Sequence, residues 1–359
     1  MMRVLIASAL ALATPATAQD QPLEVIDAAA RDRITAAVTA SGFAGTYLVY
    51  AGPRRIAGGS VGAAVEGHPG GFEPGAAWPW ASVTKQVMAV LTMQEVEKGR
   101  LALDAPVRRY LPAFRGSATL RQLLQHRAGL RNPEQSTPDA NGFPSFYSTG
   151  PGGSEWCLGN IGAPGGAWSY NNCDYIVLGA LLERTTKMSL AQLFTTRISE
   201  PLGLTAGFIA PDATAPDAMW TGGPTTAERG IIANFGAAGA LVGTATDLAT
   251  FDRALLADTL LTARSRETLW RGDPKLGFMA LGQWSFTAPL AGCAAPVRIV
   301  ERRGAIGRFA VRNVIMPDLG MSVVLFTNRG EAAEGPAGFG EVWQGKGITH
   351  TILSAAACP

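Results

Sequence analysis

The stretch Pro79-Trp80-Ala81-Ser82-Val83-Thr84-Lys85-Gln86-Val87-Met88 places a serine three residues before a lysine, where a helix is predicted to begin. Residues three apart on a helix share a face, so the Lys85 ammonium is expected beside the Ser82 hydroxyl. A lysine can take the serine proton only when burial or a neighbouring cation keeps it neutral. A helix start also presents unpaired backbone N–H groups that suit a developing negative charge. The stretch predicts a nucleophile and its base; the alternative is a solvated helix start in which Ser-x-x-Lys occurs by chance.

The composition is that of a folded globular protein. The chain has 359 residues, of which 47% are hydrophobic and 16% charged, and its net charge is +2. This length exceeds what one small core organises and suits two interleaved subdomains, while the hydrophobic content excludes a disordered chain. Because no basic or acidic run occurs, nucleic acid is not expected as a partner.

The first residues have the pattern of an export signal. Met1-Met2-Arg3 is a short positive start, Val4 to Ala13 is an apolar run too short to span a bilayer, and Ala16-Thr17-Ala18 supplies small residues for cleavage. We therefore predict a signal peptide over residues 1–18 and an exported protein, periplasmic or secreted. No membrane span is expected after cleavage, because no longer apolar run follows.

Export affects how the cysteines are interpreted. In an oxidising compartment an even number of cysteines permits two disulfides, here with three connectivities. The pairing closest in sequence joins Cys157 to Cys173 and leaves Cys293 with Cys358. The alternative is four buried free thiols. No Cys-x-x-Cys or His-x-x-x-His spacing indicates zinc, and no metal is expected.

The order of patterns along the chain is strands, a long helical stretch, then strands again. Strands are predicted near 45–50 and 55–57, as a hairpin, and near 276–284, 297–302, 309–316 and 321–328, with a closing helix near 348–357. Helices are predicted at 82–98, 119–130, 176–182, 189–198 and 248–256, the last capped by Thr246 and Asp247. The pattern Gly58-Gly59-Ser60-Val61-Gly62 is not interpreted as a nucleophile elbow, because a glycine-rich and proline-containing stretch follows where that motif needs a helix.

This order predicts an α/β (α+β) fold, in which one antiparallel sheet flanked by helices is built from both ends of the chain. The sheet-containing lobe would comprise 19–80 and 235–359, and the inserted all-helical lobe 81–234. Residues 131–166 are rich in Gly, Pro, Ser and Asn, and a long irregular segment of this kind is usually functional or mobile.

The chain resembles the serine β-lactamase and penicillin-binding protein superfamily. Within it, the resemblance is to the branch of class C β-lactamases, family VIII esterases and D-amino-acid-specific peptidases. Ser82-Val83-Thr84-Lys85 is similar to the first family motif, Ser-x-x-Lys, and Tyr170-Asn171-Asn172 to the second, Tyr-x-Asn. The linking segments LDAPVRRYLP, LLQHRAGL, EPLGL, GALVGTATDLATF and VVLFTNR follow in the expected order. The resemblance covers about residues 23 to 345 and implies the β-lactamase/transpeptidase-like fold, with the active site between the lobes.

The resemblance also implies roles for individual residues. Ser82 would be the acyl-accepting nucleophile, and Lys85 and Tyr170 would share the general-base role, with the phenol ionised or nearly so. Asn172 would hold the substrate amide or the Lys85 side chain. His126, in LLQHRAGL, would be structural, and with three histidines in the chain a Ser-His-Asp triad is not expected.

The third motif departs from the family pattern, which is Lys-Thr-Gly or His-x-Gly. Here the stretch Gly304-Ala305-Ile306-Gly307 matches the usual glycines, but Arg302 stands at the Lys or His position and Arg303 replaces a small residue. Arginine keeps the charge but cannot relay a proton, so it would lower the proton affinity of the phenol or clamp a substrate carboxylate. The backbone N–H groups of Ser82 and Ala305 would form the oxyanion hole. We therefore predict that this strand contributes four substrate-binding residues, which are Arg302, Arg303, Gly304 and Ala305. Asn172, from the second motif, is the fifth.

The sequence thus predicts an exported serine hydrolase that forms an acyl-enzyme on Ser82 and cleaves an ester or amide bond, with an esterase or peptidase favoured. One alternative is a true β-lactamase or D-Ala-D-Ala carboxypeptidase. Another is an inactive homologue that binds ligand without turnover. The expected partner is a small-molecule, peptide or β-lactam-like substrate; no cofactor is expected, and the protein is expected to be a monomer.

Overall fold

The computed structural model describes residues 28–65, 71–73, 75–140, 142–148, 153–209, 225–330 and 335–358. The predicted signal peptide, residues 1–18, lies outside this range. Within the described ranges, none of the helices combines the length and the apolar character needed to cross a membrane.

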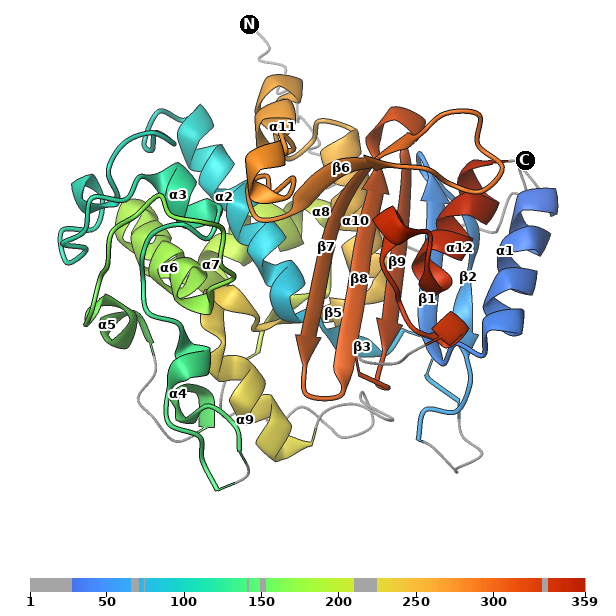
Figure 1. Ribbon diagram of the computed structural model, residues 1–359, viewed down its shortest axis with the longest axis horizontal. Helices are drawn as coiled ribbons and strands as arrows, with labels where there is room; N and C mark the ends of the chain where they lie inside the picture. Colours follow the sequence, from blue (N-terminus) through green and yellow to red (C-terminus); the bar gives the residue numbers. More distant parts are fainter. Residues whose placement is uncertain are drawn as a thin grey trace, which may run out of the picture.

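A six-stranded antiparallel sheet forms the centre of the molecule, with the strand order β2-β1-β9-β8-β7-β6 (Figure 1). The strands from the start of the chain are β1 (Gly45–Ala51) and β2 (Arg54–Val61). Those from its end are β6 (Trp284–Ala288), β7 (Val297–Ile306), β8 (Phe309–Met316) and β9 (Met321–Thr327). Both ends of the chain therefore contribute to one sheet, which confirms the predicted architecture.

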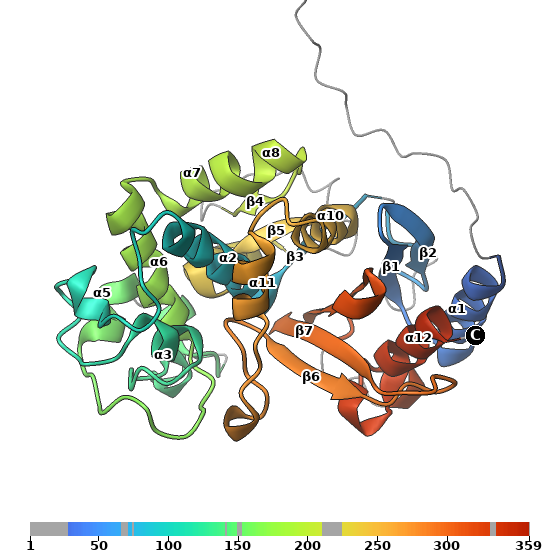
Figure 2. The ribbon, with the colours of Figure 1, turned by 90° about the horizontal axis from the view of Figure 1, so that it is seen from above.

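Helices cover both faces of this sheet. Helices α1 (Ala28–Ser41) and α12 (Gly347–Ala357) pack together on one face, while α2 (Thr84–Glu97) and α10 (Ala245–Leu256) lie on the other (Figure 2). Successive strand residues point to opposite faces, and the burial follows this rule on β7. Val300 and Ile306 join the core on the α2 side, whereas Ile299 and Ala305 contact the core on the α12 side.

Most of the remaining helices lie on the side of α2 that faces away from α1 and α12, whereas α8 contacts α10 and α11 contacts α2 (Figures 1 and 2). Their bounds are α3 (Leu120–Leu124), α4 (Ser145–Ser148), α5 (Gly153–Leu158), α6 (Asn172–Thr186), α7 (Leu190–Phe194), α8 (Glu200–Leu202), α9 (Thr226–Asn234) and α11 (Ala263–Leu269). A second, three-stranded sheet has the order β3-β5-β4, with β3 (Ala77–Pro79), β4 (Gly207–Phe208) and β5 (Leu241–Thr244). This small sheet was not predicted, and the predicted boundaries of the lobes stay predictions.

Three predicted elements have other boundaries or another cap in the structure. The strand predicted at 276–284 is a short 3-10 helix, Pro274–Leu276, and a loop, and β6 begins only at Trp284. The helix predicted to reach residue 130 ends at Leu124, and His126 follows in a left-handed conformation with φ +58°. The cap of α10 is Thr244, whose side chain accepts from the N–H of Asp247 in a capping box.

A buried polar cluster holds α2 against the sheet. The Asn313 side-chain amide on β8 donates to Gln86 Oε1 on α2 at 3.0 Å and to Asp252 Oδ1 on α10 at 2.8 Å. Burial raises the pKa of the Asp252 carboxyl, although the Asn313 hydrogen bond opposes the shift. This cluster fixes the helix that carries Lys85 relative to the strands.

Two disulfides are present, and they lie on different sides of the molecule. Cys157 in α5 joins Cys173 in α6, and Cys293 joins Cys358 at the end of α12. No cysteine among the described residues is free. The connectivity is the one closest in sequence.

Candidate active site

Ser82 lies in a short 3-10 helix, Ala81–Val83, which leads directly into α2. Ala81, the residue before it, has φ +44°, a value that a residue with a side chain adopts at the expense of backbone strain. The preceding Trp80 is anchored to the small sheet because its N–H donates to Leu241 O at 2.8 Å. The serine therefore projects from a constrained bend at the start of the helix.

Strand β7 approaches this bend closely at Gly304. A Cβ atom on Gly304 would lie 2.7 Å from Ser82 N and 2.9 Å from Trp80 O, which leaves no room for a side chain. Beyond Glu301, β7 pairs with β8 alone, because β6 begins with Trp284 opposite Glu301. The strand edge at residues 302–306 therefore runs past Ser82 without a neighbouring strand.

The Ser82 hydroxyl lies between two side chains that can exchange protons with it. Lys85 Nζ is 3.0 Å from Ser82 Oγ, and Tyr170 Oη is 2.5 Å from the same oxygen. A second hydrogen bond, from Lys85 Nζ to Ala238 O at 2.7 Å, fixes the amine. The structure thus brings together the three residues that the sequence predicts as catalytic.

Lys85 is held in an environment that favours its neutral form. Its side chain is fully buried, and this desolvation lowers its pKa well below the ordinary value. The positive charge of Arg302 lowers it further, whereas the carboxylates of Glu134 and Asp174 oppose the shift. Burial and a neighbouring cation are the two conditions under which a lysine serves as a base.

Tyr170 behaves differently. Burial raises the pKa of its phenol, although the charge of Arg302 and the hydrogen bond with Ser82 act in the opposite direction. Burial therefore disfavours the ionised phenol in the free protein, and the expected ionisation of Tyr170 stays a prediction. Lys85 is the better candidate for the base, and Tyr170 for a group that donates and relays protons.

Arg302 is completely buried at the back of the site. Its Nε donates to Ser82 O at 2.9 Å and its Nη2 to Tyr170 Oη at 3.4 Å, while Nη1 has no hydrogen-bond partner among the described residues. The guanidinium carbon also lies 5.2 Å from the centre of the Trp284 ring. The predicted placement of this cation beside Tyr170 agrees with these contacts.

Arg303 points to the other face of the sheet. It forms ion pairs with Glu301 and Glu341, at 2.9 Å to Glu301 Oε1 and 2.5 Å to Glu341 Oε1. These ion pairs hold the guanidinium beside Glu301 and Glu341 and away from Ser82. Arg303 nevertheless lines the pocket over Ser82, and its predicted role in substrate binding stays a prediction. Ala305 shares this face but lines the pocket beside Ser82 through its position on the strand edge.

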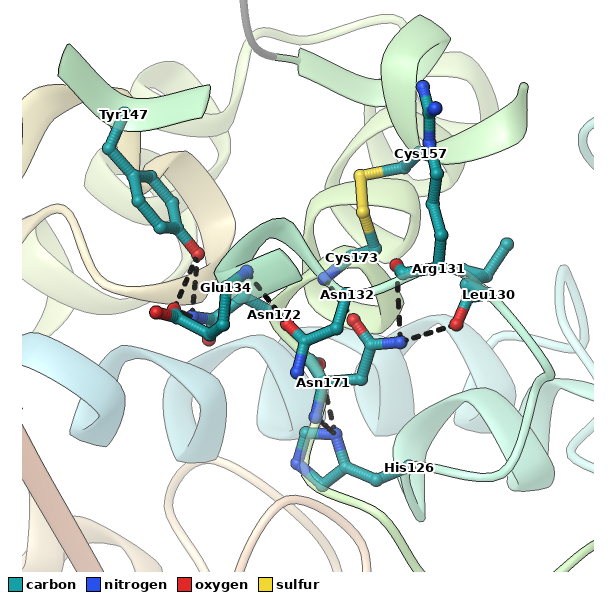
Figure 3. The surroundings of a disulfide bond; sticks show 10 residues. All are labelled: His126, Leu130, Arg131, Asn132, Glu134, Tyr147, Cys157, Asn171, Asn172 and Cys173. Carbon is teal, nitrogen blue, oxygen red and sulfur yellow. Dashed lines mark hydrogen bonds between the residues drawn. A yellow bond between two sulfur atoms is a disulfide. The ribbon is translucent and has the colours of Figure 1, made fainter. Parts of the chain in front are cut away.

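Asn172 is buried at the first turn of α6, where it meets the irregular segment after α3 (Figure 3). Its Nδ2 donates to Tyr147 Oη at 2.7 Å and to Glu134 Oε1 at 3.2 Å, and Tyr147 Oη donates to the same carboxylate oxygen at 3.2 Å. The Asn172 amide therefore makes no hydrogen bond to Lys85. Its Oδ1 is buried without a partner among the described residues, and the predicted contact of Asn172 with a substrate amide stays a prediction.

Two residues of this network, Glu134 and Tyr147, were not predicted from the sequence. The Tyr147 ring stacks on Phe235 with 3.9 Å between centroids, which fixes it over Asn172. Neither residue belongs to a periodic pattern or a recognised motif. The available signal was the irregular segment itself, which was predicted to be functional or mobile.

His126 packs behind Tyr170, with 4.8 Å between ring centres. Its Nδ1 lies 3.1 Å from Asn171 O and 3.4 Å from Asp174 Oδ2. Burial lowers the pKa of His126, helped by the charges of Arg302 and Lys85, and burial raises the pKa of Asp174. Burial thus disfavours the charged form of each group, and the His126 ring supports the Tyr170 ring from behind.

An open pocket of about 450 Å³ lies over the nucleophile. Aromatic side chains form one wall and the edge of β7 the other. Its lining residues are Ser82, Trp168, Tyr170, Trp284, Arg302, Arg303, Gly304 and Ala305. The nucleophile, the Tyr170 phenol and an open strand edge thus face one cavity, with the Lys85 amine buried directly behind Ser82 Oγ, an arrangement suited to acyl transfer.

Comparison with known proteins agrees with this chemistry. A family model described as Beta-lactamase matches residues 30–343 of the chain. Esterase EstB of Burkholderia gladioli is 34% identical over 151 residues, which make up 37% of this chain and 38% of EstB. A D-aminopeptidase of Cereibacter sphaeroides is 30% identical over 150 residues, which make up 40% of this chain and 29% of that protein. The chain thus matches less than two fifths of the length of these relatives.

Solved structures show the same fold. The D-amino acid amidase from Ochrobactrum anthropi SV3, crystallised with L-phenylalanine amide, superposes with a TM-score of 0.73. The match covers 91% of this chain and 99% of the amidase at 18% identity. At this identity the likeness concerns the fold alone.

Proposed function

The chain belongs to the beta-lactamase family, and we propose that it is an exported serine hydrolase that forms an acyl-enzyme on Ser82 and hydrolyses an ester or amide bond. The observation that carries the proposal is the position of Ser82 Oγ, within hydrogen-bonding distance of both Lys85 Nζ and Tyr170 Oη. The likeness to an esterase and a D-aminopeptidase supports the choice of bond.

In the first half-reaction, neutral Lys85 takes the Ser82 proton while Oγ attacks the carbonyl carbon. The negative charge that develops on the carbonyl oxygen would be bound by the backbone N–H groups of Ser82 and Ala305. Tyr170 Oη, next to Ser82 Oγ, gives its proton to the departing alcohol or amine and is reprotonated from the Lys85 ammonium. The acyl group remains on Oγ, and the leaving group departs neutral.

In the second half-reaction, a water molecule attacks the acyl carbon. Its proton passes to the neutral Lys85 amine, directly or through Tyr170, and then returns to Ser82 Oγ as the ester bond breaks. Arg302 takes no proton in either step, because a guanidinium does not deprotonate in proteins. Its contribution is electrostatic: it favours the neutral form of Lys85.

A second candidate function is the cleavage of an N-terminal amino acid from a peptide, or the hydrolysis of an amino acid amide. Either substrate carries a free α-ammonium group. Glu134 favours this function. Its carboxylate is held by Asn172 and Tyr147, yet the residue is exposed, and Oε2 has no partner among the described residues. A carboxylate fixed beside the amide of Asn172 suits the recognition of a substrate ammonium.

The experiment compares three substrates, a p-nitrophenyl ester, a D-amino acid p-nitroanilide and a chromogenic cephalosporin, with the wild type and Ser82→Ala. The proposal expects turnover of the ester or the anilide that depends on Ser82. Turnover of the anilide that falls in Glu134→Gln, with ester turnover retained, would identify the second candidate. Efficient turnover of the cephalosporin with poor ester turnover would instead indicate a β-lactamase. Ligand binding that Ser82→Ala leaves unchanged, without any turnover, would indicate an inactive homologue.

A further inference from the structure

A second cavity, of about 340 Å³, lies on the far side of Trp284 from the nucleophile. It is lined by Gly277, Phe278, Trp284, Phe286, Thr287, Glu301, Arg303 and Trp343. Trp284 and Arg303 also line the pocket over Ser82, so the two cavities adjoin each other along the edge of the sheet. A ligand that occupies one can therefore extend into the other.

Exposed aromatic side chains form the rim of this second cavity. Phe278 is 45% and Trp343 58% exposed, and both are among the four large apolar side chains recorded as exposed in the described ranges. The other two, Val65 and Leu319, are aliphatic and line neither of these two cavities. Single exposed apolar residues are ordinary, but two large aromatic rings at the mouth of one cavity are typical of a binding surface.

The backbone holds Phe278 in this exposed position. Its φ is +64°, which is rare for a bulky residue. Hydrogen bonds on both sides fix the strained residue: its N–H donates to Asp273 O at 2.9 Å, and its carbonyl accepts from Ser285 N at 3.0 Å. Strain of this kind persists where the surrounding structure imposes it, and it is commonest at sites that bind ligands.

The charged side chains at the base of the cavity form ion pairs with one another, although Glu301 Oε2 has no hydrogen-bond partner among the described residues. Glu301 and Glu341 share Arg303, and Trp343 Nε1 donates to Glu341 Oε2 at 2.9 Å, which fixes the orientation of the indole. Arg312 balances the remaining charge through Glu301. Because the charges offset one another, the cavity offers no excess charge to an ionic ligand, and its aromatic walls favour an uncharged flat group.

We propose that this cavity, the aromatic subsite (Phe278, Trp284, Phe286 and Trp343), binds an aromatic ring of the substrate that is joined by a spacer to the carbonyl attacked by Ser82. The spacer crosses Trp284, which separates the two cavities. The inference rests on the proposed function for the attack on the carbonyl, but binding of the ring does not depend on turnover. The subsite selects long acyl groups that end in an aromatic ring over short ones.

The kinetic test uses p-nitrophenyl esters of 6-phenylhexanoate and of acetate. In the wild type the longer ester has the higher kcat/KM. Phe278→Ala and Trp343→Ala each lower kcat/KM for the longer ester by about 3- to 10-fold and leave acetate unchanged, because a ring-to-ring contact contributes about 0.5–1.5 kcal/mol. Leu319→Ala, which removes an exposed apolar side chain elsewhere, is the matched control and changes neither ester.

A binding measurement separates this inference from the proposed function. Titration calorimetry with 6-phenylhexanamide and the Ser82→Ala protein measures binding of the aromatic ring in the absence of any reaction. Binding is expected to weaken when Phe278→Ala or Trp343→Ala is added to Ser82→Ala, and equal binding with and without the added substitution would overturn the inference. Ester turnover without discrimination between acyl groups would overturn the inference alone. Absence of turnover alongside ring-dependent binding would overturn the proposed function and leave the subsite standing.

Discussion

Two arginines that are neighbours in the sequence lie on opposite faces of β7 and have opposite environments. Arg302 faces α2, is fully buried and has no carboxylate partner in the part of the chain that the structure describes. Arg303 faces the other side and is paired with two carboxylates, Glu301 and Glu341. The charge of Arg303 is therefore offset locally, whereas the charge of Arg302 acts on the titratable groups around it.

The pKa directions agree with this difference. Arg302 lowers the pKa of Lys85 and of His126, in both cases adding to the effect of burial. On the other face, the carboxylates raise the pKa of Arg303 although burial opposes the shift. The comparison teaches that the same residue type tunes a site when it is left without a counter-ion and stabilises the fold when it is paired.

The largest expected effect lies on the Arg302 face, in the variant Lys85→Met. Loss of the base should lower kcat/KM for a p-nitrophenyl ester by about 10²- to 10⁴-fold. The melting temperature should not fall, because the variant replaces a buried amine by an apolar side chain of similar length. Lys346→Met, at an exposed lysine, is the control and should leave both quantities unchanged. Nearly normal turnover in Lys85→Met would remove Lys85 from the base role.

The next largest effect is expected on the face of β7 that carries Arg303, where the arginine is paired with carboxylates. Glu301→Gln should reduce the free energy of unfolding by about 3–5 kcal/mol, because it removes the carboxylate that pairs with the buried Arg312 and that also contacts the partly exposed Arg303. Glu267→Gln, which breaks the exposed pair with Arg298, should reduce it by about 1 kcal/mol or less. Urea unfolding measures both. If Glu301→Gln abolished turnover while leaving stability unchanged, the two faces would not be separable as argued.

The two disulfides also allow a change near the site to be compared with a change far from it. Cys293 and Cys358 are separated by 65 residues, so the loop-closure model assigns their bond about 4 kcal/mol, against about 3 kcal/mol for Cys157–Cys173 with a separation of 16. Cys173, however, follows Asn172 directly. Replacing Cys157 and Cys173 by Ser should lower kcat/KM by about 10-fold through misplacement of Asn172.

The other double Ser variant, at Cys293 and Cys358, serves as the matched control. It should lose more stability in urea unfolding yet retain its kcat/KM when assayed while folded. An equal loss of activity in both double variants would show that the disulfide beside Asn172 has no particular connection with the site.

The smallest effect is a change in the pH profile of kcat/KM. Neutral Lys85 is the active form, so activity rises with pH through the pKa of this group. Arg302 lowers that pKa, and therefore Arg302→Gln should move the acidic limb of the profile to higher pH. Arg302→Lys, which keeps the positive charge, should leave the limb close to its wild-type position. A limb that stays in place in Arg302→Gln would show that this cation does not tune Lys85.

Much of the site follows from local sequence rules. Ser82 and Lys85 lie on one helix face because their spacing is three, and the neighbourhood of Tyr170 was expected from the order of motifs. The opposite orientation of Arg302 and Arg303 follows from the alternation of a strand, although the sequence interpretation assigned both to the substrate. Here a general rule of strand geometry was more informative than the position of a residue in a motif.

Other parts of the site could not be predicted from the sequence, because they depend on irregular backbone. Glu134 and Tyr147 reach Asn172 through turns that no periodic pattern encodes. Phe278 was placed in a strand because apolar residues dominate 276–284, whereas the φ values of +61° at Gly277 and +64° at Phe278 turn the chain into a loop. Long-range contacts decide these conformations, and local propensity does not.

The central claim is that Ser82 is the nucleophile and that Lys85 activates it. Intact-mass spectrometry after incubation with a fluorophosphonate probe tests the claim most directly, followed by peptide mapping of the adduct. We expect one adduct per chain, on the peptide that contains Ser82, with much slower labelling in Lys85→Met and none in Ser82→Ala. Labelling that persists in Ser82→Ala, or an adduct on another residue, would contradict it.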